Sequence, residues 1–460
     1  MPLSWLLSRR ALLQTALIPL VASPFVNRAF GQQPLPPIIF LHGNGDHAAL
    51  WITTLWRFES NGYPADRLLA INFTDPLARA DDAVAQAGRS SSEDQLRELT
   101  AAIDGLRERT GAARVALVGS SRGGYAIRNY VMNGGAANVS HAIFCGVPNR
   151  GVFDWEFSPG SEFNGRAPFL RKLNAGETDV VAGTAFLTLR SDGNDKFAQA
   201  DGAFVGRAGT PTGITAEGPT LRGATNIALG QLDHREVAFH PRAFGEMYKF
   251  IMGREPARLA IVPEPRVTLD GLATGLPGGV PTNRPLAGAT VELFRVSDEG
   301  ERLGERVHHR VTGSDGRWGP AAVDPTWDLE FVIEAAGHPT THIYRSPFLR
   351  SSGIVHLRPA RPLGKSDAGA GAVVMMSRPR GYFGIPRDGV QLDGKEPTDV
   401  KRGVPTDSIA TVRLPGGEVG RAVVASFSPH PVPGVYNEER IVARAWPAAE
   451  NRITIAELTY

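Results

Sequence analysis

Short apolar runs recur through the first half of the chain, and segments with helical spacing separate them. The runs that we interpret as strands cover residues 38–41, 68–73, 115–118, 142–145, 186–189 and 225–229. Alternation of strands and helices is typical of a parallel sheet, because parallel neighbours need a crossover connection between them. The pattern therefore predicts an α/β domain with a mostly parallel sheet.

Two intervening helices are visible as apolar positions spaced three and four residues apart. These positions are Leu96, Leu99, Ile103 and Leu106 in the first helix and Phe244, Met247, Tyr248 and Ile251 in the second. A Ser92-x-x-Gln95 pattern predicts a capped start for the first helix. The second helix is expected to begin at Pro241 and to end at Gly253.

The pattern of the sequence changes after Glu255, where several prolines lie close together and the helical spacing of apolar residues ends. From there on, strand-like runs such as residues 289–294 and 329–333 alternate with turn signals. A stretch rich in proline, glycine and alanine at residues 359–372 divides this region again. We expect the α/β domain at 32–255, followed by a mostly β region, a sandwich or barrel, with one unit at 256–362 and a second at 363–460.

The order of residues at the chain start predicts an export signal at residues 1–31. Arg9 and Arg10 precede an apolar stretch, and small residues lie near Gly31. The stretch contains prolines and is shorter than the ~20 residues of a spanning helix, so we expect cleavage rather than an integral membrane anchor. Paired arginines favour twin-arginine export over an ordinary secretory signal. The mature protein is then expected to be secreted or periplasmic.

Composition and charge narrow the classes of partner. The 460 residues include 49 Lys and Arg against 47 Asp and Glu, a formal net charge of +2, so no general polyanion-binding surface is indicated. Nucleic acid is therefore not expected as a partner. Cys145 is the single cysteine, which excludes an intramolecular disulfide and a thiolate-rich zinc site. We expect no metal and no other cofactor, and the oligomeric state stays open.

The strongest local signal for chemistry is Gly119-Ser120-Ser121-Arg122-Gly123, a G-x-S-x-G motif. It follows an apolar strand and precedes a helical pattern, which is the setting of a nucleophile elbow. In this arrangement the glycines let the chain reverse sharply, and the serine hydroxyl projects beyond the sheet edge. We predict that Ser121 is a catalytic nucleophile.

A serine hydroxyl needs a base and an acid that orients the base, and both are expected downstream. For the base we favour His234, which follows the last predicted strand of the domain, over His240, which adjoins a proline at a helix start. For the acid, the loop after the strand at 186–189 offers Asp192 and Asp195. We favour Asp195, because a turn residue usually comes first in such loops.

Backbone N–H groups are also required to stabilise the oxyanion that develops during acyl transfer. The predicted strand at 38–41 leads into a loop, His42-Gly43-Asn44-Gly45-Asp46, at the same sheet edge. We assign the amides of Asn44 and Arg122 as the oxyanion donors. His42 is expected to have a structural role rather than to act as a second base.

These residues resemble the lipase and esterase branch of the α/β-hydrolase superfamily, in which serine, acid and histidine follow one another along the chain. The resemblance to class 2 bacterial lipases covers about residues 36–253. It rests on His42-Gly43, Asn61-Gly62-Tyr63-Pro64, residues 119–123, Gly146-Val147-Pro148-Asn149-Arg150-Gly151 and Phe169-Leu170-x-x-Leu173-Asn174. The segment Tyr344-Arg345-Ser346-Pro347-Phe348 resembles the C-terminal β domain of an archaeal long-chain lipase. The resemblance implies a carboxylic ester hydrolase with a Ser-His-Asp triad and an acyl-enzyme.

Two features depart from this family pattern. Arg122 follows the nucleophile where many lipases have an apolar or small residue, which predicts a charge beside the acyl site. In the archaeal lipase the acid follows the preceding strand, where this chain has Cys145 and Gly146 and no carboxylate. The choice of Asp195 therefore follows the commoner hydrolase layout.

The motifs do not determine the substrate, because similarity of fold does not fix the pocket. Residues 152–182 form an aromatic-rich insertion that is either a lid with an apolar wall or a cap sealed onto the core. Lipids, other acyl esters and hydrophobic polyesters all fit as substrates, and an acyltransferase would use the same acyl-enzyme. A binding protein on an inactive hydrolase scaffold is a further alternative. The β region is expected to bind a polymer surface, close over the site or add stability.

Overall fold

The computed structural model describes residues 35–429 and 438–460. The predicted export signal at residues 1–31 lies outside the described residues. Among the helices that are described, none is both long and apolar enough to cross a membrane.

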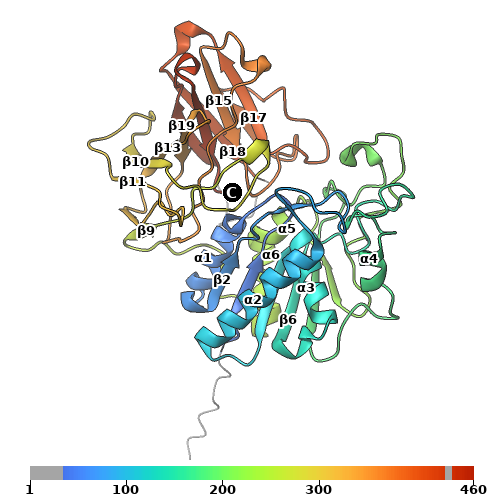
Figure 1. The fold of residues 1–460 in the computed structure, drawn as a ribbon. Coiled ribbons are helices and arrows are strands. Elements are labelled where there is room, and N and C mark those ends of the chain that lie inside the picture. The colour runs from blue at the N-terminus through green and yellow to red at the C-terminus, as the bar shows by residue number, and fades with distance from the viewer. Residues whose placement is uncertain (1–34, 430–437) are drawn as a thin grey trace, which may run out of the picture. The chain divides into compact units, whose positions relative to one another are not determined.

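Six parallel strands form the sheet of the first half of the chain, in the order β2-β1-β5-β6-β7-β8. Two of them, β2 and β6, are labelled in Figure 1. Their bounds are β1 Ile38–Leu41, β2 Leu68–Ile71, β5 Val115–Ser120, β6 Val139–Cys145, β7 Ala185–Arg190 and β8 Thr225–Ala228; β3 Leu77–Ala78 and β4 Arg89–Ser90 form a separate pair. The predicted α/β domain with a parallel sheet is thus confirmed. The order of the strands reverses between β1 and β5, and open α/β sheets bind ligands beyond the carboxyl ends at such a switch point.

Helices cover both faces of this sheet. They are α1 Ile52–Ser60, α2 Ser92–Thr110, α3 Arg122–Met132, α4 Pro168–Leu173, α5 Glu236–Phe239 and α6 Pro241–Met252. The helices α2 and α3 lie on one face, where Ile39 packs in one cluster with Leu99. On the other face Phe40 contacts Phe58 of α1 with ring centroids 5.8 Å apart. Burial of alternate residues on opposite faces explains why the strands are continuous apolar runs in the sequence.

The ends of the two predicted helices differ in how closely they match the prediction. The cap of α2 is Ser91 rather than Ser92: its hydroxyl accepts from the backbone N–H of Asp94 at 3.1 Å, and Asp94 accepts from the Ser91 N–H at 2.9 Å. An aspartate therefore takes the role that the sequence pattern gave to Gln95, which is buried instead. The helix α6 begins at Pro241 and ends at the left-handed Gly253, as predicted.

Strands dominate the second half of the chain, which confirms the predicted mostly β region. They are β9 Val267–Leu269, β10 Thr290–Val296, β11 His308–Val311, β12 Ala321–Val323, β13 Asp328–Glu334, β14 Thr340–Arg345, β15 Ala372–Ser377, β16 Gly389–Leu392, β17 Ile409–Leu414, β18 Ala422–Ser428, β19 Glu439–Arg444 and β20 Arg452–Glu457. Seven of them form one sheet in the order β11-β10-β13-β14-β20-β15-β17. This sheet contains strands from both 256–362 and 363–460, so the division into two β units stays a prediction.

Apolar side chains from the α/β domain and the β region form a shared core. Ile52 and Trp56 of α1 pack in one buried cluster with Val267 and Leu269 of β9. The indole N–H of Trp56 also donates to the Ser351 carbonyl at 3.0 Å. The region from β9 onward is therefore packed against the α/β domain rather than tethered to it.

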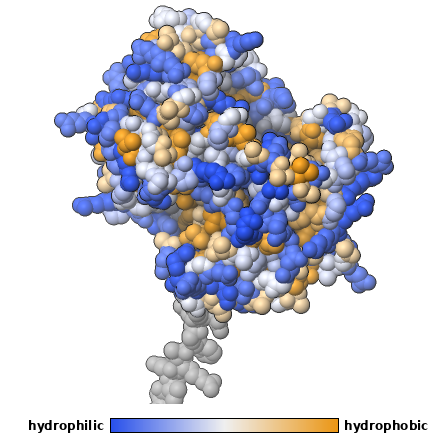
Figure 2. All heavy atoms as spheres, viewed as in Figure 1, coloured by the Kyte–Doolittle hydropathy of each residue, from blue (hydrophilic) through white to orange (hydrophobic). Residues whose placement is uncertain are grey.

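On the face shown in Figure 2, apolar residues form small patches among hydrophilic ones.

Candidate active site

Ser121 lies at the bend between β5 and α3 with φ 50° and ψ −126°. Positive φ is unfavourable for a residue with a side chain, so this bend is strained and must be fixed by its surroundings. Close packing requires the motif glycines: a Cβ on Gly119 would lie 2.8 Å from the Gly123 backbone, and one on Gly123 would lie 2.6 Å from the His42 carbonyl. The sharp turn that the motif predicts is therefore present at Ser121.

His234 and Asp195 form a buried pair. The Nδ1 atom of His234 lies 2.9 Å from a carboxylate oxygen of Asp195, and both side chains are about 3% exposed. Asp195 also accepts from the backbone N–H of Phe197 at 2.8 Å, which orients the carboxylate. Since a carboxylate only accepts, Nδ1 carries the proton, and Nε2 is left as the basic nitrogen.

The two rival residues have other contacts. Asp192 accepts from the backbone N–H groups of Asn194 at 3.2 Å and Gln231 at 2.9 Å, so it holds the turn before Asp195. His240 caps α6, with its Nδ1 accepting from the Arg242 N–H at 3.2 Å. Burial lowers the pKa of His240 to about 3, which keeps the ring neutral. The structure therefore brings Asp195, and not Asp192, to His234.

Gly146 explains why no carboxylate follows β6. A Cβ at this position would lie 2.7 Å from the His234 carbonyl oxygen and 3.4 Å from its Nδ1. The His234 loop thus packs directly on the Gly146 backbone, and a side chain would displace it. The carboxylate reaches Nδ1 from the loop after β7 instead.

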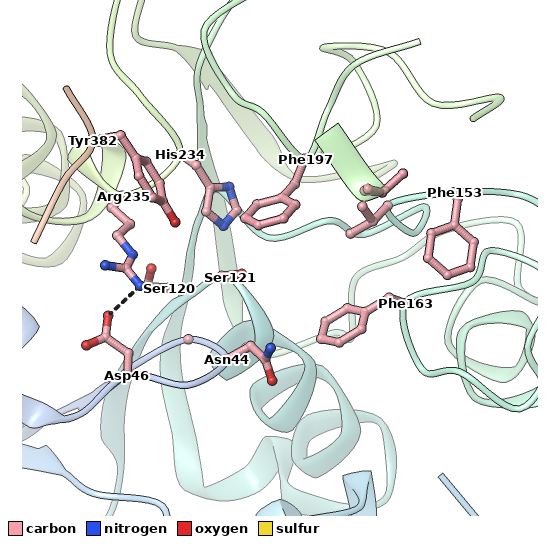
Figure 3. A pocket seen from close by; sticks show the side chains of 13 residues that line it. Asn44, Asp46, Ser120, Ser121, Phe153, Phe163, Phe197, His234, Arg235 and Tyr382 are labelled. Carbon is pink, nitrogen blue, oxygen red and sulfur yellow. Dashed lines mark ion pairs between the residues drawn. The ribbon is translucent and has the colours of Figure 1, made fainter. Parts of the chain in front are cut away.

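Ser121 and His234 line the same cavity, which has a volume of about 230 Å³ (Figure 3). Its apolar wall is formed by Val152, Phe153, Phe163, Phe197 and Val205. Three of these belong to the predicted insertion at 152–182, so this insertion forms part of the cavity wall. The polar part of the wall is formed by Asn44, Asp46, Arg235 and Tyr382. A bound molecule with one apolar and one polar end matches this lining.

The predicted oxyanion donors, the amides of Asn44 and Arg122, belong to the loop after β1 and to the start of α3. Arg122 is the first residue of α3, so its amide has no acceptor inside the helix and lies at the positive end of the helix dipole. Asn44 lines the cavity, and its side-chain oxygen accepts from the Ala78 N–H at 2.7 Å. Among the described residues no acceptor is found for the Asn44 amide. The assignment of these two amides as oxyanion donors stays a prediction.

His42 fixes the loop that carries Asn44. Its Nδ1 donates to the Gly43 carbonyl at 2.9 Å, and its Nε2 accepts from the Phe73 N–H at 3.0 Å. Burial lowers the pKa of His42, in keeping with a neutral ring that donates from one nitrogen and accepts at the other. Asn283 of the β region supports the same loop by donating to the Asp46 carbonyl at 3.0 Å.

The Arg122 side chain corrects one expectation. The sequence predicted a charge beside the acyl site, but Arg122 is not among the residues that line the cavity. Its guanidinium is fully buried, forms an ion pair with Glu162 and donates to the Ser90 carbonyl at 2.7 Å. Because Glu162 belongs to the 152–182 insertion, this ion pair fastens the insertion to the start of α3.

Several residues at this site carry no signal in the sequence. Asp233 and Glu236 flank His234 and are held by arginines of the β region: Arg378 lies 3.1 Å from Asp233 and 2.6 Å from Glu236. Burial opposes ionisation of Glu236, but the charges of Arg378 and Arg387 outweigh it and lower the pKa of this carboxyl. The loop with His234 is thus fixed by residues far away in the chain.

A parallel sheet with a strained serine after its β5 strand is an α/β-hydrolase fold. Residues 35–150 match the class 2 lipase family, and residues 265–362 match the lipase C-terminal domain. The chain therefore has an α/β-hydrolase fold, and two of its segments are similar to lipase domains, as the resemblance in the sequence implied.

Three of the solved structures that are similar to this chain share little sequence with it. Lipase B of Aspergillus fumigatus is 15% identical, and the match covers 51% of this chain and 56% of the lipase, with a TM-score of 0.35. Lipase BlEst2 of Bacillus licheniformis in its propeptide form is 14% identical over 89% of this chain and 94% of its own, with a TM-score of 0.36. Phospholipase PlaB of Legionella pneumophila is 14% identical over 66% of this chain and 85% of its own, with a TM-score of 0.35. No curated protein sequence matches significantly.

Proposed function

We propose that this lipase-class protein is an exported serine hydrolase that cleaves carboxylic esters through Ser121, His234 and Asp195. The observation that carries the proposal is the shared cavity: Ser121 sits on it at a strained bend, and so does His234, whose Nδ1 is 2.9 Å from Asp195. The residues also follow the chain order of α/β-hydrolase triads.

In the proposed mechanism, His234 Nε2 takes the proton of Ser121 as Oγ attacks the ester carbonyl carbon. The negative oxygen that results accepts from the amides of Asn44 and Arg122. Asp195 stabilises the imidazolium through Nδ1. His234 then protonates the leaving alcohol, which leaves an acyl group on Ser121, and a water activated by the same histidine releases the acid.

The apolar wall supports an acyl group as the ligand of that side of the cavity. Phe153 stacks on Trp155 with ring centroids 4.5 Å apart, and Phe163 lies 6.1 Å from the Tyr125 ring. The insertion at 152–182 therefore acts both as a wall and as a packed cap in this proposal. The proposal covers lipid esters, simple acyl esters and hydrophobic polyesters as substrates.

Export is part of the proposal and rests on the sequence alone. Arg9 and Arg10 precede the apolar stretch, and twin-arginine signals have this order. Replacement of both arginines by lysine is expected to retain the protein inside the cell, while wild type appears in the periplasm or medium. Unchanged export of the double variant would favour an ordinary secretory signal.

Hydrolysis of p-nitrophenyl esters of increasing chain length tests the catalytic proposal. Ser121→Ala is expected to lower kcat by at least about 10⁴-fold, because the nucleophile is lost while the cavity is kept. Ser140→Ala is the matched control: this hydroxyl donates to the Val115 carbonyl at the other end of the sheet. Equal hydrolysis by wild type and Ser121→Ala would show that another group is the nucleophile.

A further inference from the structure

The polar side of the cavity comes partly from the β region. Tyr382 lies between β15 and β16 and reaches the cavity next to Arg235 and Asp46 (Figure 3). Arg235 and Asp46 are 3.9 Å apart at their nearest charged atoms. The apolar wall from the insertion lies across the cavity from them in Figure 3, with Ser121 between the two.

The Tyr382 hydroxyl has no partner among the described residues, although the side chain is only 6% exposed. Figure 3 shows this hydroxyl directed into the cavity beside His234. A hydroxyl that faces a cavity and makes no hydrogen bond to the protein can pair with an atom of a bound ligand. Burial raises the pKa of Tyr382 to about 12, so the hydroxyl keeps its proton and can donate.

Tyr382 is fixed relative to the proposed base. Its backbone N–H donates to Asp233, the residue before His234, at 2.7 Å, and its carbonyl accepts from Arg378. The Lys196 ammonium lies 3.8 Å from the centroid of the Tyr382 ring and donates to the Thr406 carbonyl at 2.9 Å. These contacts hold the phenol in one position without using its hydroxyl.

Arg235 and Asp46 define which ligand groups fit beside Tyr382. One Arg235 nitrogen donates to the Pro379 carbonyl at 2.6 Å, which leaves other N–H groups of the guanidinium for a ligand. The Asp46 carboxylate accepts from the His47 N–H at 2.9 Å and has further lone pairs. Donors and an acceptor thus stand side by side, and hydroxyl groups match them because they both donate and accept. An anionic group would face the charge of Asp46.

We propose that Tyr382, Arg235 and Asp46 form an alcohol-side subsite that binds free hydroxyl groups on the alcohol part of the ester, as in a glycerol monoester. This inference rests on the proposed esterase function, which sets the ester carbon at Ser121. With the acyl chain on the phenylalanine wall, the alcohol part extends toward Tyr382.

The test compares two esters of the same medium-chain acid, the glycerol monoester and the methyl ester, at concentrations below aggregation. Wild type is expected to have the higher kcat/KM for the glycerol monoester. Tyr382→Phe is expected to lower the ratio of the two kcat/KM values about tenfold, the effect of one lost hydrogen bond to the ligand. Tyr130→Phe, which removes a hydroxyl paired with Asn138 near the end of α3, is expected to keep the ratio.

The outcomes separate this inference from the proposed function. If folded Tyr382→Phe loses activity on both esters equally, the tyrosine has no role in alcohol recognition and the subsite is wrong. If Tyr382→Phe does not fold, Asp46→Asn decides: an unchanged ratio overturns the subsite and a lowered ratio supports it. If Ser121→Ala hydrolyses both esters like wild type, the esterase mechanism itself fails.

Discussion

Arg378 of the β region forms a buried ion pair with Glu236, with Nη2 and Oε1 2.6 Å apart. The same guanidinium lies 3.1 Å from Asp233, on the other side of His234 in the chain. The β region therefore determines where the loop with the proposed base lies. A role in surface binding alone does not account for these contacts, because they are buried and directed at the site.

Removal of this cation is expected to destabilise the protein strongly. Arg378→Met leaves Asp233 and Glu236 with fewer compensating charges in the interior, which costs about 3–5 kcal/mol of unfolding free energy. Urea denaturation measures this loss. Arg413→Met is the control, because its pair with Asp367 is partly exposed and is expected to contribute less than about 1 kcal/mol. Equal losses in the two variants would contradict a special role for the Arg378 cluster.

The two candidate acids are expected to behave differently when each becomes an amide. Asp195→Asn removes the acceptor that sets the His234 tautomer, so kcat is expected to fall by about 10³–10⁴-fold. Asp192→Asn keeps most of the turn contacts to Asn194 and Gln231, so kcat is expected to stay within several-fold of wild type. Steady-state kinetics on one soluble ester measures both, and the reverse result would assign the acid to Asp192.

Addition of a methyl group at Gly43, beside the nucleophile, is expected to impair catalysis. In Gly43→Ala the new methyl lies 3.0 Å from Ser121 Cβ and 3.6 Å from its Oγ. The serine or the neighbouring loop must shift by tenths of an ångström, and we expect a loss of about tenfold or more in kcat/KM. Gly353→Ala, where the methyl meets no atom within 4 Å, serves as the control. Full activity of Gly43→Ala would show that the loop yields without harm to the site.

The buried His240 side chain is expected to make the free energy of unfolding depend on pH. Burial holds its pKa at about 3 in the folded protein against 6.5 for the free side chain, so between these values the unfolded chain binds the additional proton. Stability from this residue is therefore present at neutral pH and is lost as the pH falls from 6.5 toward 3, by about 1.4 kcal/mol per pH unit.

His240→Asn keeps a side chain able to cap α6 and removes the titrating group. Between pH 6.5 and 5 the wild type is expected to lose about 2 kcal/mol more unfolding free energy than the variant. Urea titrations at the two pH values measure the difference. Parallel losses in both proteins would assign the acid sensitivity to other groups.

The sequence predicts those parts of the site that depend on local pattern. Ser121 is identified because its bend needs glycines on both sides, and the strands are identified because burial on both faces makes continuous apolar runs. Asp195 and His234 follow strands at the same sheet edge, so the topology brings them near the serine. Each of these sequence patterns lies within a few residues of the side chain whose position it predicts.

The rest depends on contacts between distant segments. Nothing around Tyr382 or Arg378 distinguishes them from other residues of a β region, because their roles arise only from packing against the His234 loop. The direction of the Arg122 side chain likewise depends on Glu162, a residue of another segment. The cap of α2 is one position earlier than predicted, because Asp94 accepts from the Ser91 N–H as the predicted pattern required of Gln95.

The position of β20 has a consequence for how the protein is made and truncated. This strand, the last one described, pairs in parallel with both β14 and β15 at the interior of the seven-stranded sheet. The sheet is therefore incomplete until residues 452–457 have left the ribosome. A chain cut near residue 362 would expose the edge of β14, and unpaired edges promote aggregation. Single substitutions are for this reason a cleaner probe of the β region than deletion.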